Sequence, residues 1–114
     1  MAAVSAYLAD MSAYKLGLVH IGGHIAFQIE EIARLCKERG IILLEDCAHA
    51  HGAYWNGKKP GTWGHAGVYS FYATKTISTG EGGMLVSNNE DLIEFAKKYR
   101  NYGKFDYEVE GLNY

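Results

Sequence analysis

Residues 16–46 read LGLVHIGGHIAFQIEEIARLCKERGIILLED and carry two short apolar runs with a helical pattern between them. The first run, 16–21, ends in two glycines, which is typical of a buried strand closed by a tight turn. Between Ile29 and Cys36 apolar residues recur three and four positions apart, as on one face of a helix, and Gly40 follows at a cap position. The second run, 41–44, suits a parallel strand covered on both faces. The stretch therefore predicts a strand–helix–strand unit of an α/β fold.

The rest of the chain extends this unit. Residues 48–66 are rich in glycine and aromatic residues and hold the only proline, which predicts a loop. Two more strands are predicted at 68–71 and 83–87, and because the segment between them lacks a helical pattern, we expect them to pair antiparallel. A final helix is predicted from about 89 to 101, with Asn88 as its N-cap. The expected sheet is mostly parallel, with one antiparallel strand.

Composition limits the classes of function. The chain has 114 residues, of which 48% are hydrophobic, so we expect one modest domain with its own core. A formal net charge of −2 leaves no basic excess for nucleic acid. No apolar run approaches the roughly 18 residues of a membrane span, and the start has no signal-peptide pattern. We therefore expect a soluble, cytoplasmic protein whose two cysteines, Cys36 and Cys47, are reduced and buried.

Two residues of complementary chemistry are expected at one edge of this sheet. Asp46 ends a predicted parallel strand, where ligands bind in open α/β sheets, although it could also simply cap the next turn. Lys75 lies in a loop that leaves another strand, where it could also be a solvated lysine. Pyridoxal phosphate (PLP) catalysis needs such a pair: a lysine that forms a Schiff base with the aldehyde, and a carboxylate that keeps the pyridine nitrogen protonated. The Ser70 hydroxyl could bind the phosphate or a neighbouring backbone group.

Two strings around these residues resemble the DegT/StrS family of PLP-dependent sugar aminotransferases. The strings are Glu45-Asp46-Cys47-Ala48-His49-Ala50-His51-Gly52-Ala53 and Ser70-Phe71-Tyr72-Ala73-Thr74-Lys75 with Gly80-Glu81-Gly82-Gly83. The similarity covers about residues 17–114 and includes Arg100-Asn101-Tyr102-Gly103 and Leu112-Asn113-Tyr114. It implies part of the large, cofactor-binding domain of a fold type I, aspartate aminotransferase-like transferase. The implied reaction moves an amino group from an amino acid such as glutamate to a keto sugar, expected to be nucleotide-linked, in amino-sugar, polysaccharide or antibiotic biosynthesis.

The resemblance also implies roles for individual residues. Lys75 matches the lysine that forms the Schiff base, and Asp46 matches the partner of the pyridine nitrogen. His49 matches a Gln or His near the ring hydroxyl, with Ala48 beside it in the cofactor site. Ser70 matches a serine that contacts the phosphate. Because the lysine position is kept, the resemblance favours transamination over the dehydration catalysed by relatives with a histidine there.

The end of the chain bears on assembly. Asn113 matches an asparagine that family members contribute to the phosphate site of the neighbouring subunit, which implies a homodimer with shared active sites. Family members are much longer, with an earlier segment that binds the phosphate and a later small domain. Residues 1–15 match the family poorly, so the sequence predicts a partial large domain over 1–114 whose isolated activity would be low.

Two other interpretations remain open. The ligand types in His20, His24, His49, His51 and Cys47 suit a metal site, but Gly22-Gly23 argues against a helix that would bring the first two histidines together. The other alternative is a catalytically inactive α/β module that acts by association, since truncated sheets expose their edges and nine tyrosines are available for an interface. The prediction remains an enzyme without a metal.

Overall fold

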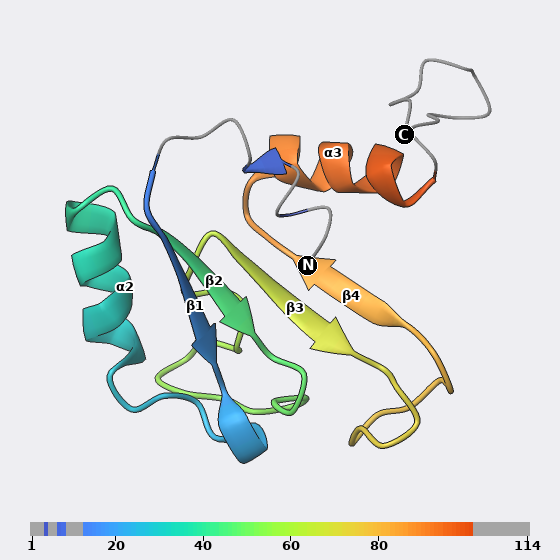
Figure 1. Ribbon diagram of the computed structural model, residues 1–114. Helices are drawn as coiled ribbons and strands as arrows, with labels where there is room; N and C mark the ends of the chain where they lie inside the picture. The colour runs from blue at the N-terminus through green and yellow to red at the C-terminus, as the bar shows by residue number, and fades with distance from the viewer. Residues whose placement is uncertain (1–3, 5–6, 9–12, 102–114) are drawn as a thin grey trace. The chain divides into compact units, whose positions relative to one another are not determined.

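A computed structural model describes residue 4, residues 7–8 and residues 13–101 of the chain. The residues divide into two compact units, Ala13–Asn88 and a second one whose described residues are 4, 7–8 and 89–101. The elements of the first unit are β1 (Lys15–Val19), the short 3₁₀ turn η1 (Ile21–Gly23), α2 (Ile29–Glu38), β2 (Ile42–Asp46), β3 (Ala66–Ser70) and β4 (Gly83–Val86) (Figure 1). The second unit contains α3 (Glu90–Arg100).

The sheet has the strand order β1-β2-β3-β4. The pairs β1–β2 and β2–β3 are parallel, and β3–β4 is antiparallel, as the arrows in Figure 1 show. This confirms the predicted α/β fold with one antiparallel strand. The carboxyl ends of β1, β2 and β3 consequently lie along one edge of the sheet, and the β3–β4 connection starts from that edge.

The core of this unit forms between α2 and one face of the sheet. Ile25, Ile29, Cys36 and Leu43 are buried together, and the indole ring of Trp63 packs against them. Because side chains alternate along a strand, Leu43 and Glu45 of β2 share this face, while Leu44 and Asp46 point to the other. The apolar positions read from the sequence as one helix face are thus the positions that bury α2.

Gly40 ends α2 in a conformation that favours glycine. Gly40 has a φ of 64°, its N–H donates to the carbonyl of Lys37, and the N–H of Ile41 donates to that of Cys36. This pair of backward bonds is the Schellman arrangement, in which the residue after the C-cap takes a left-handed conformation that glycine adopts at little cost. The chain then turns directly into β2.

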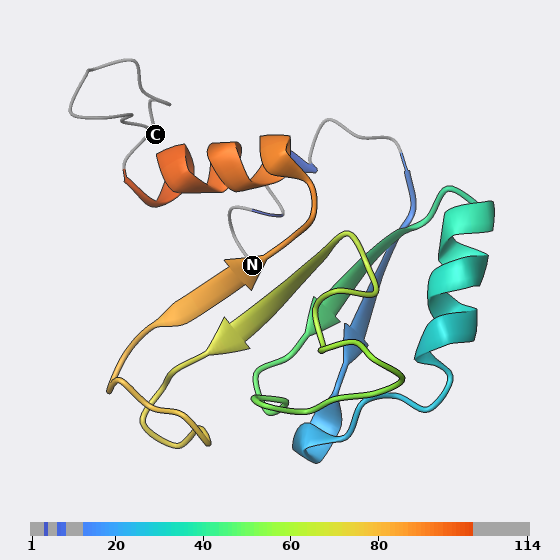
Figure 2. The same cartoon turned by 180° about the vertical axis from the view of Figure 1, so that it is seen from behind.

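The loop prediction for 48–66 is largely confirmed. Turns and one isolated bridge, between Trp55 and Lys58, fill the segment before β3, so the parallel pair β2–β3 is connected without a crossover helix. Figure 2 shows this segment crossing the face of the sheet that is turned away in Figure 1. β3 begins two residues earlier than predicted, because Ala66 and Gly67 pair with β2 despite the low strand propensity of glycine.

The predicted N-cap of α3 was wrong by one residue. The side chain of Asn89, not Asn88, accepts a hydrogen bond from the N–H of Leu92 at 3.0 Å. Both residues are asparagines, so the sequence pattern alone could not choose between them. Within this second unit the rings of Tyr7 and Phe95 meet edge to face with centroids 5.4 Å apart.

The cysteines of the described residues agree with the expectation from composition. Both cysteines, Cys36 and Cys47, are free and buried, as expected. None of the helices in the described part of the chain has the length and apolar character that crossing a membrane requires.

Candidate active site

The strand register brings Asp46 and Ser70 onto one face of the sheet. Asp46 pairs with Val68 of β3, and residues paired in this way point to the same side. Ser70 lies two residues beyond Val68, so its hydroxyl is on the face of Asp46, at the end of the next strand. Both side chains are partly buried. They therefore share the carboxyl edge of the parallel strands, where α/β sheets bind ligands.

The Asp46 carboxylate is only partly used by the protein. Its Oδ1 accepts a hydrogen bond from the N–H of Ala48 at 3.0 Å, which closes the turn after β2. No other hydrogen bond to this carboxylate is found in the described part of the chain, so Oδ2 is available to a ligand. Asp46 therefore does cap the next turn, as the sequence allowed, but its Oδ2 stays free to bind a ligand.

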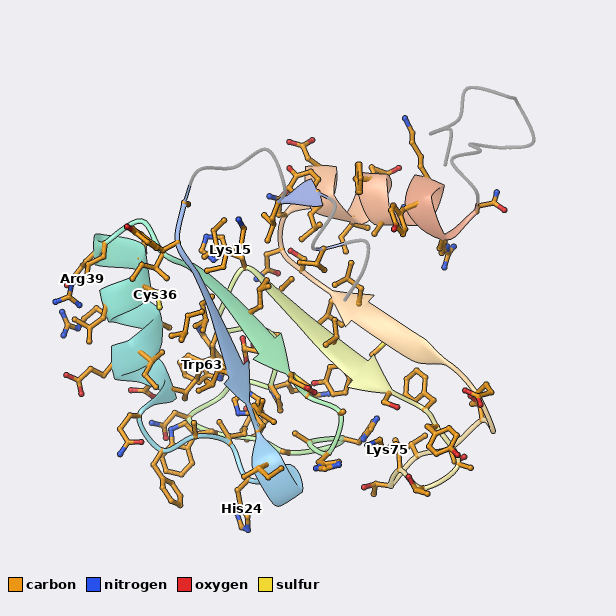
Figure 3. All side chains as sticks on the ribbon, viewed as in Figure 1. Lys15, His24, Cys36, Arg39, Trp63 and Lys75 are labelled. Atoms are coloured by element: carbon orange, nitrogen blue, oxygen red, sulfur yellow. The ribbon has the colours of Figure 1, made fainter. Side chains whose placement is uncertain are left out.

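Lys75 lies in the connection that follows β3. The N–H of Phe71 donates to the carbonyl of Gly82 and the N–H of Thr79 to that of Phe71, so the two ends of this connection are held together. The backbone N–H of Lys75 donates to the carbonyl of Tyr72 at 2.9 Å, which makes a tight turn at the lysine. Figure 3 shows Lys75 between this loop and the carboxyl end of the sheet, and its side chain is partly buried.

The Ser70 hydroxyl keeps its proton available. Its Oγ accepts a hydrogen bond from the N–H of Tyr72 at 3.3 Å, which uses a lone pair and leaves the O–H free to donate. A free hydroxyl donor at a strand end is a group that binds phosphate oxygens.

The remaining predicted residues differ in position. His49 is exposed in the turn after β2, close in sequence to Asp46. Ala48 lies in the same turn, but its N–H is already bonded to Asp46, so it is not a free donor. Asn113 lies outside the described residues, as do Tyr102, Gly103 and Leu112. The structure thus brings together Asp46, Ser70 and the Lys75 loop at one edge.

Glu45 has a role in the structure that the sequence did not predict. This carboxylate points to the opposite face from Asp46, and its side chain and that of His20 are both fully buried, with His20 Nε2 and Glu45 Oε2 2.9 Å apart. Glu45 also accepts three backbone hydrogen bonds, from the N–H groups of Gly61 (2.7 Å), Trp63 (2.8 Å) and Gly64 (2.6 Å). Burial by itself would raise the pKa of Glu45, but the bonds from His20 and these three N–H groups outweigh it and lower the pKa. The signal was an acid on the core face of a buried strand, followed by a Gly-rich loop.

The same cluster bears on the metal interpretation. Among the described residues, His20, Glu45 and Cys47 place possible ligand atoms within 4.8 Å of one another. However, Glu45 is occupied by four donors, and Nδ1 of His20 accepts from the N–H of Ala26 at 3.3 Å. Burial, with the nearby Glu45 charge, raises the pKa of the Cys47 thiol to about 12, whereas metals bind the thiolate. His24 is exposed, and Figure 3 shows it pointing away from the sheet. This cluster is built as a structural hydrogen-bond network.

Comparison with known proteins gives a consistent result. The sequence model described as the DegT/DnrJ/EryC1/StrS aminotransferase family matches residues 16–114. GDP-perosamine synthase of Vibrio cholerae is 47% identical over 85 residues, which cover 75% of this chain and 23% of that protein. A Campylobacter jejuni UDP-4-amino-4,6-dideoxy-N-acetyl-beta-L-altrosamine transaminase is 39% identical over 88 residues, 77% of this chain and 23% of the transaminase.

A solved structure has the same fold. Helicobacter pylori PseC, an aminotransferase involved in the biosynthesis of pseudoaminic acid, superposes with a TM-score of 0.77 at 33% identity, covering 96% of this chain and 29% of that one. The chain thus spans about a quarter of the length of the relatives it matches.

Proposed function

Because the chain belongs to the DegT/DnrJ/EryC1/StrS aminotransferase family, we propose that it carries the cofactor-binding centre of a PLP-dependent sugar aminotransferase. The observation that carries the proposal is the edge of the sheet at which the partly used carboxylate of Asp46, the hydroxyl of Ser70 and the Lys75 loop meet. Each of these groups has a complement in PLP, namely the pyridine nitrogen, the phosphate and the aldehyde. The donor set therefore fits the cofactor.

Within this proposal each residue has a distinct task. When bound, PLP supplies an electron sink for breaking a bond at the amino-bearing carbon of the substrate. Asp46 would keep a proton on the pyridine nitrogen through its free oxygen, while its bond to the Ala48 N–H fixes the carboxylate. Lys75 would hold the cofactor covalently, Ser70 would donate to its phosphate, and His49, in the turn after β2, would bind the ring hydroxyl.

The substrate class is proposed from the relatives. Their names describe a GDP-sugar synthase and a UDP-sugar transaminase, which supports a nucleotide-linked sugar as the substrate class. A keto sugar as amino acceptor and an amino acid such as glutamate as donor belong to the same proposal. A homodimer in which Asn113 completes the phosphate site of the neighbouring subunit belongs to the same proposal, as does the assignment of residues 1–114 to the large domain. The cytoplasmic location remains a prediction from the sequence.

Chemical trapping tests the assignment of Lys75. Purified protein is incubated with PLP, reduced with borohydride and digested with trypsin, and the peptides are mapped by mass spectrometry. We expect one pyridoxyl adduct, on Lys75, because this lysine lies in the connection that leaves the edge holding Asp46 and Ser70. Lys75→Ala should abolish the adduct, while the matched control Lys59→Ala, an exposed lysine in the 47–65 segment, should keep it. A label on Lys58 or Lys59 in place of Lys75 would contradict the proposal.

A further inference from the structure

Glu45 joins three segments of the chain at one buried point. Its Oε2 accepts from the ring of His20, just after β1, and from the N–H of Gly61, while its Oε1 accepts from the N–H groups of Trp63 and Gly64. Four donors around one carboxylate saturate it, so it has no capacity left for a ligand. These four donors stabilise the negative charge of the carboxylate at this buried position.

His20 extends this arrangement to Asp46. The backbone N–H of His20 donates to the carbonyl of Asp46 at 3.0 Å, while its ring donates to Glu45. The proton must be on Nε2, because Nδ1 accepts from the N–H of Ala26. His20, just after β1, thus contacts Glu45 through its side chain and Asp46 through its backbone.

The other side of β2 is held as well. The N–H of Cys47 donates to the carbonyl of Val68 at 2.8 Å, so the peptide after Asp46 is fixed to β3. These hydrogen bonds hold the backbone on both sides of Asp46, while the Asp46 side chain points to the face of the sheet that carries Ser70. Its direction therefore depends on the backbone that Glu45 and His20 anchor from the opposite face.

We propose that Glu45 is a positioning residue that sets the orientation of the Asp46 carboxylate by anchoring the end of β2 to His20 and to the 61–64 loop. This inference rests on the proposed function, since it assumes that Asp46 meets the cofactor. Stability alone does not call for a buried charge here, because buried ionic groups can often be replaced by apolar ones at little cost. The Glu45 carboxylate, with its four donors, fixes the backbone beside Asp46, and this can preorganise the site by orienting the Asp46 carboxylate.

Replacing Glu45 by glutamine tests the anchoring directly. Glutamine has the same shape, but one of its two terminal groups is an NH₂, which cannot accept. At least one pair of donors, either His20 with Gly61 or Trp63 with Gly64, then faces another donor. We expect the end of β2 to shift and PLP affinity, measured by absorbance titration of the purified protein, to fall by roughly tenfold, the lower end of the losses seen when outer-shell partners are removed.

A double-mutant cycle separates positioning from a general structural role. PLP dissociation constants are measured for the wild type, Glu45→Gln, Asp46→Asn and the double variant, with circular dichroism to confirm folding. If Glu45 acts through Asp46, Glu45→Gln weakens binding in the wild-type background and changes it less than about twofold in the Asp46→Asn background. An equal loss in both backgrounds overturns the inference. Glu90→Gln, an exposed acid in the first turn of α3, is the matched control and should leave affinity unchanged.

Two further outcomes are distinguishable. If Glu45→Gln does not fold, His20→Ala removes only one of the four bonds to Glu45 and is put through the same cycle, with the same non-additivity expected at smaller size. If the wild type neither binds PLP nor gains a pyridoxyl label on Lys75, both the proposed function and this inference fail. Wild-type binding with an additive cycle overturns the inference alone.

Discussion

Glu45 and Asp46 are neighbours in the sequence, but their carboxylates lie on opposite faces of β2. Glu45 accepts four hydrogen bonds inside the protein, while Asp46 accepts one and keeps an oxygen free. The difference follows from strand alternation, which sends one residue into the core beside α2 and the next to the ligand edge. The two adjacent acids therefore differ in role because they lie on different faces of β2: Glu45 holds the structure, and Asp46 is available for chemistry.

Asp46→Asn should lower the rate of the chemical step far more than the affinity for PLP. The amide retains the size of the side chain and can still accept from the Ala48 N–H, but it carries no charge to hold a proton on the pyridine nitrogen. In a complete aminotransferase that carries this segment, we expect kcat for the amination of a nucleotide-linked keto sugar to fall by several orders of magnitude while bound PLP stays detectable by absorbance. Near-normal kcat would mean that Asp46 only caps the turn after β2.

Glu45 should make the free energy of unfolding depend on pH. Its pKa is lowered in the folded protein, so its charged form contributes stability above its unfolded value of about 4.5, and this contribution is lost as the pH falls through the lower folded value. We expect the free energy of unfolding, measured in urea between pH 7 and pH 3, to decline less steeply in Glu45→Gln than in the wild type. Parallel declines in both proteins would show that other carboxylates carry the acid sensitivity.

At the scale of elements, β3 is held by a close approach of two glycines. A Cβ added to Gly67 would overlap the Cα of Gly61 and lie 3.2 Å from Cγ2 of Val86. Gly67→Ala should therefore destabilise the protein by about 1–3 kcal/mol, as overpacking commonly does, measured by urea unfolding. The matched control is Gly17→Ala in β1, where an added Cβ meets nothing within 4 Å, and it should change stability little. A similar loss in both variants would point to backbone effects in place of the contact.

The start of α3 offers a comparison between adjacent asparagines. Asn89 accepts from the Leu92 N–H, whereas Asn88 is exposed and precedes the cap. Asn89→Ala should cost roughly 1 kcal/mol of stability, the usual value for a lost N-cap, while Asn88→Ala should cost close to nothing. Thermal unfolding of the two variants makes the comparison, and an equal effect of both substitutions would contradict the assignment of the cap.

At the scale of the whole chain, the sequence patterns that predicted the fold are those with a physical period. The helix face around Ile29 and Cys36 and the apolar run before Glu45 follow from burial, and the antiparallel pairing of β4 follows from the shortness of its connection. Asp46 and Lys75 were expected at one edge because ligands bind at the carboxyl ends of parallel strands. The register places Asp46 and Ser70 at that edge, and the connection that carries Lys75 leaves from it.

The contacts that escaped prediction join segments distant in the sequence. The bonds between Glu45 and the 61–64 loop span 16 to 19 residues and have no periodic signature. His20 looked like a possible metal ligand because its ring chemistry is the same in a metal site and in a hydrogen-bond network; only its buried partner decides between them. The N-cap was misplaced because two adjacent asparagines offered the same side chain.

Shared active sites predict a specific result for mixed dimers. In a two-fold symmetric dimer whose sites each combine Lys75 of one subunit with Asn113 of the other, a hybrid of a Lys75→Ala subunit and an Asn113→Ala subunit holds one site with both residues intact and one with neither. Random reassociation of equal amounts makes half of the dimers hybrids, so about a quarter of all sites are restored. In a complete aminotransferase that carries this segment, we expect the mixture, after reversible dissociation, to recover about a quarter of the transaminase activity of the unsubstituted protein from two variants that are each nearly inactive. If Asn113 serves the site of its own subunit, no site in the hybrid is complete, and the activity of the mixture stays at the average of the two variants.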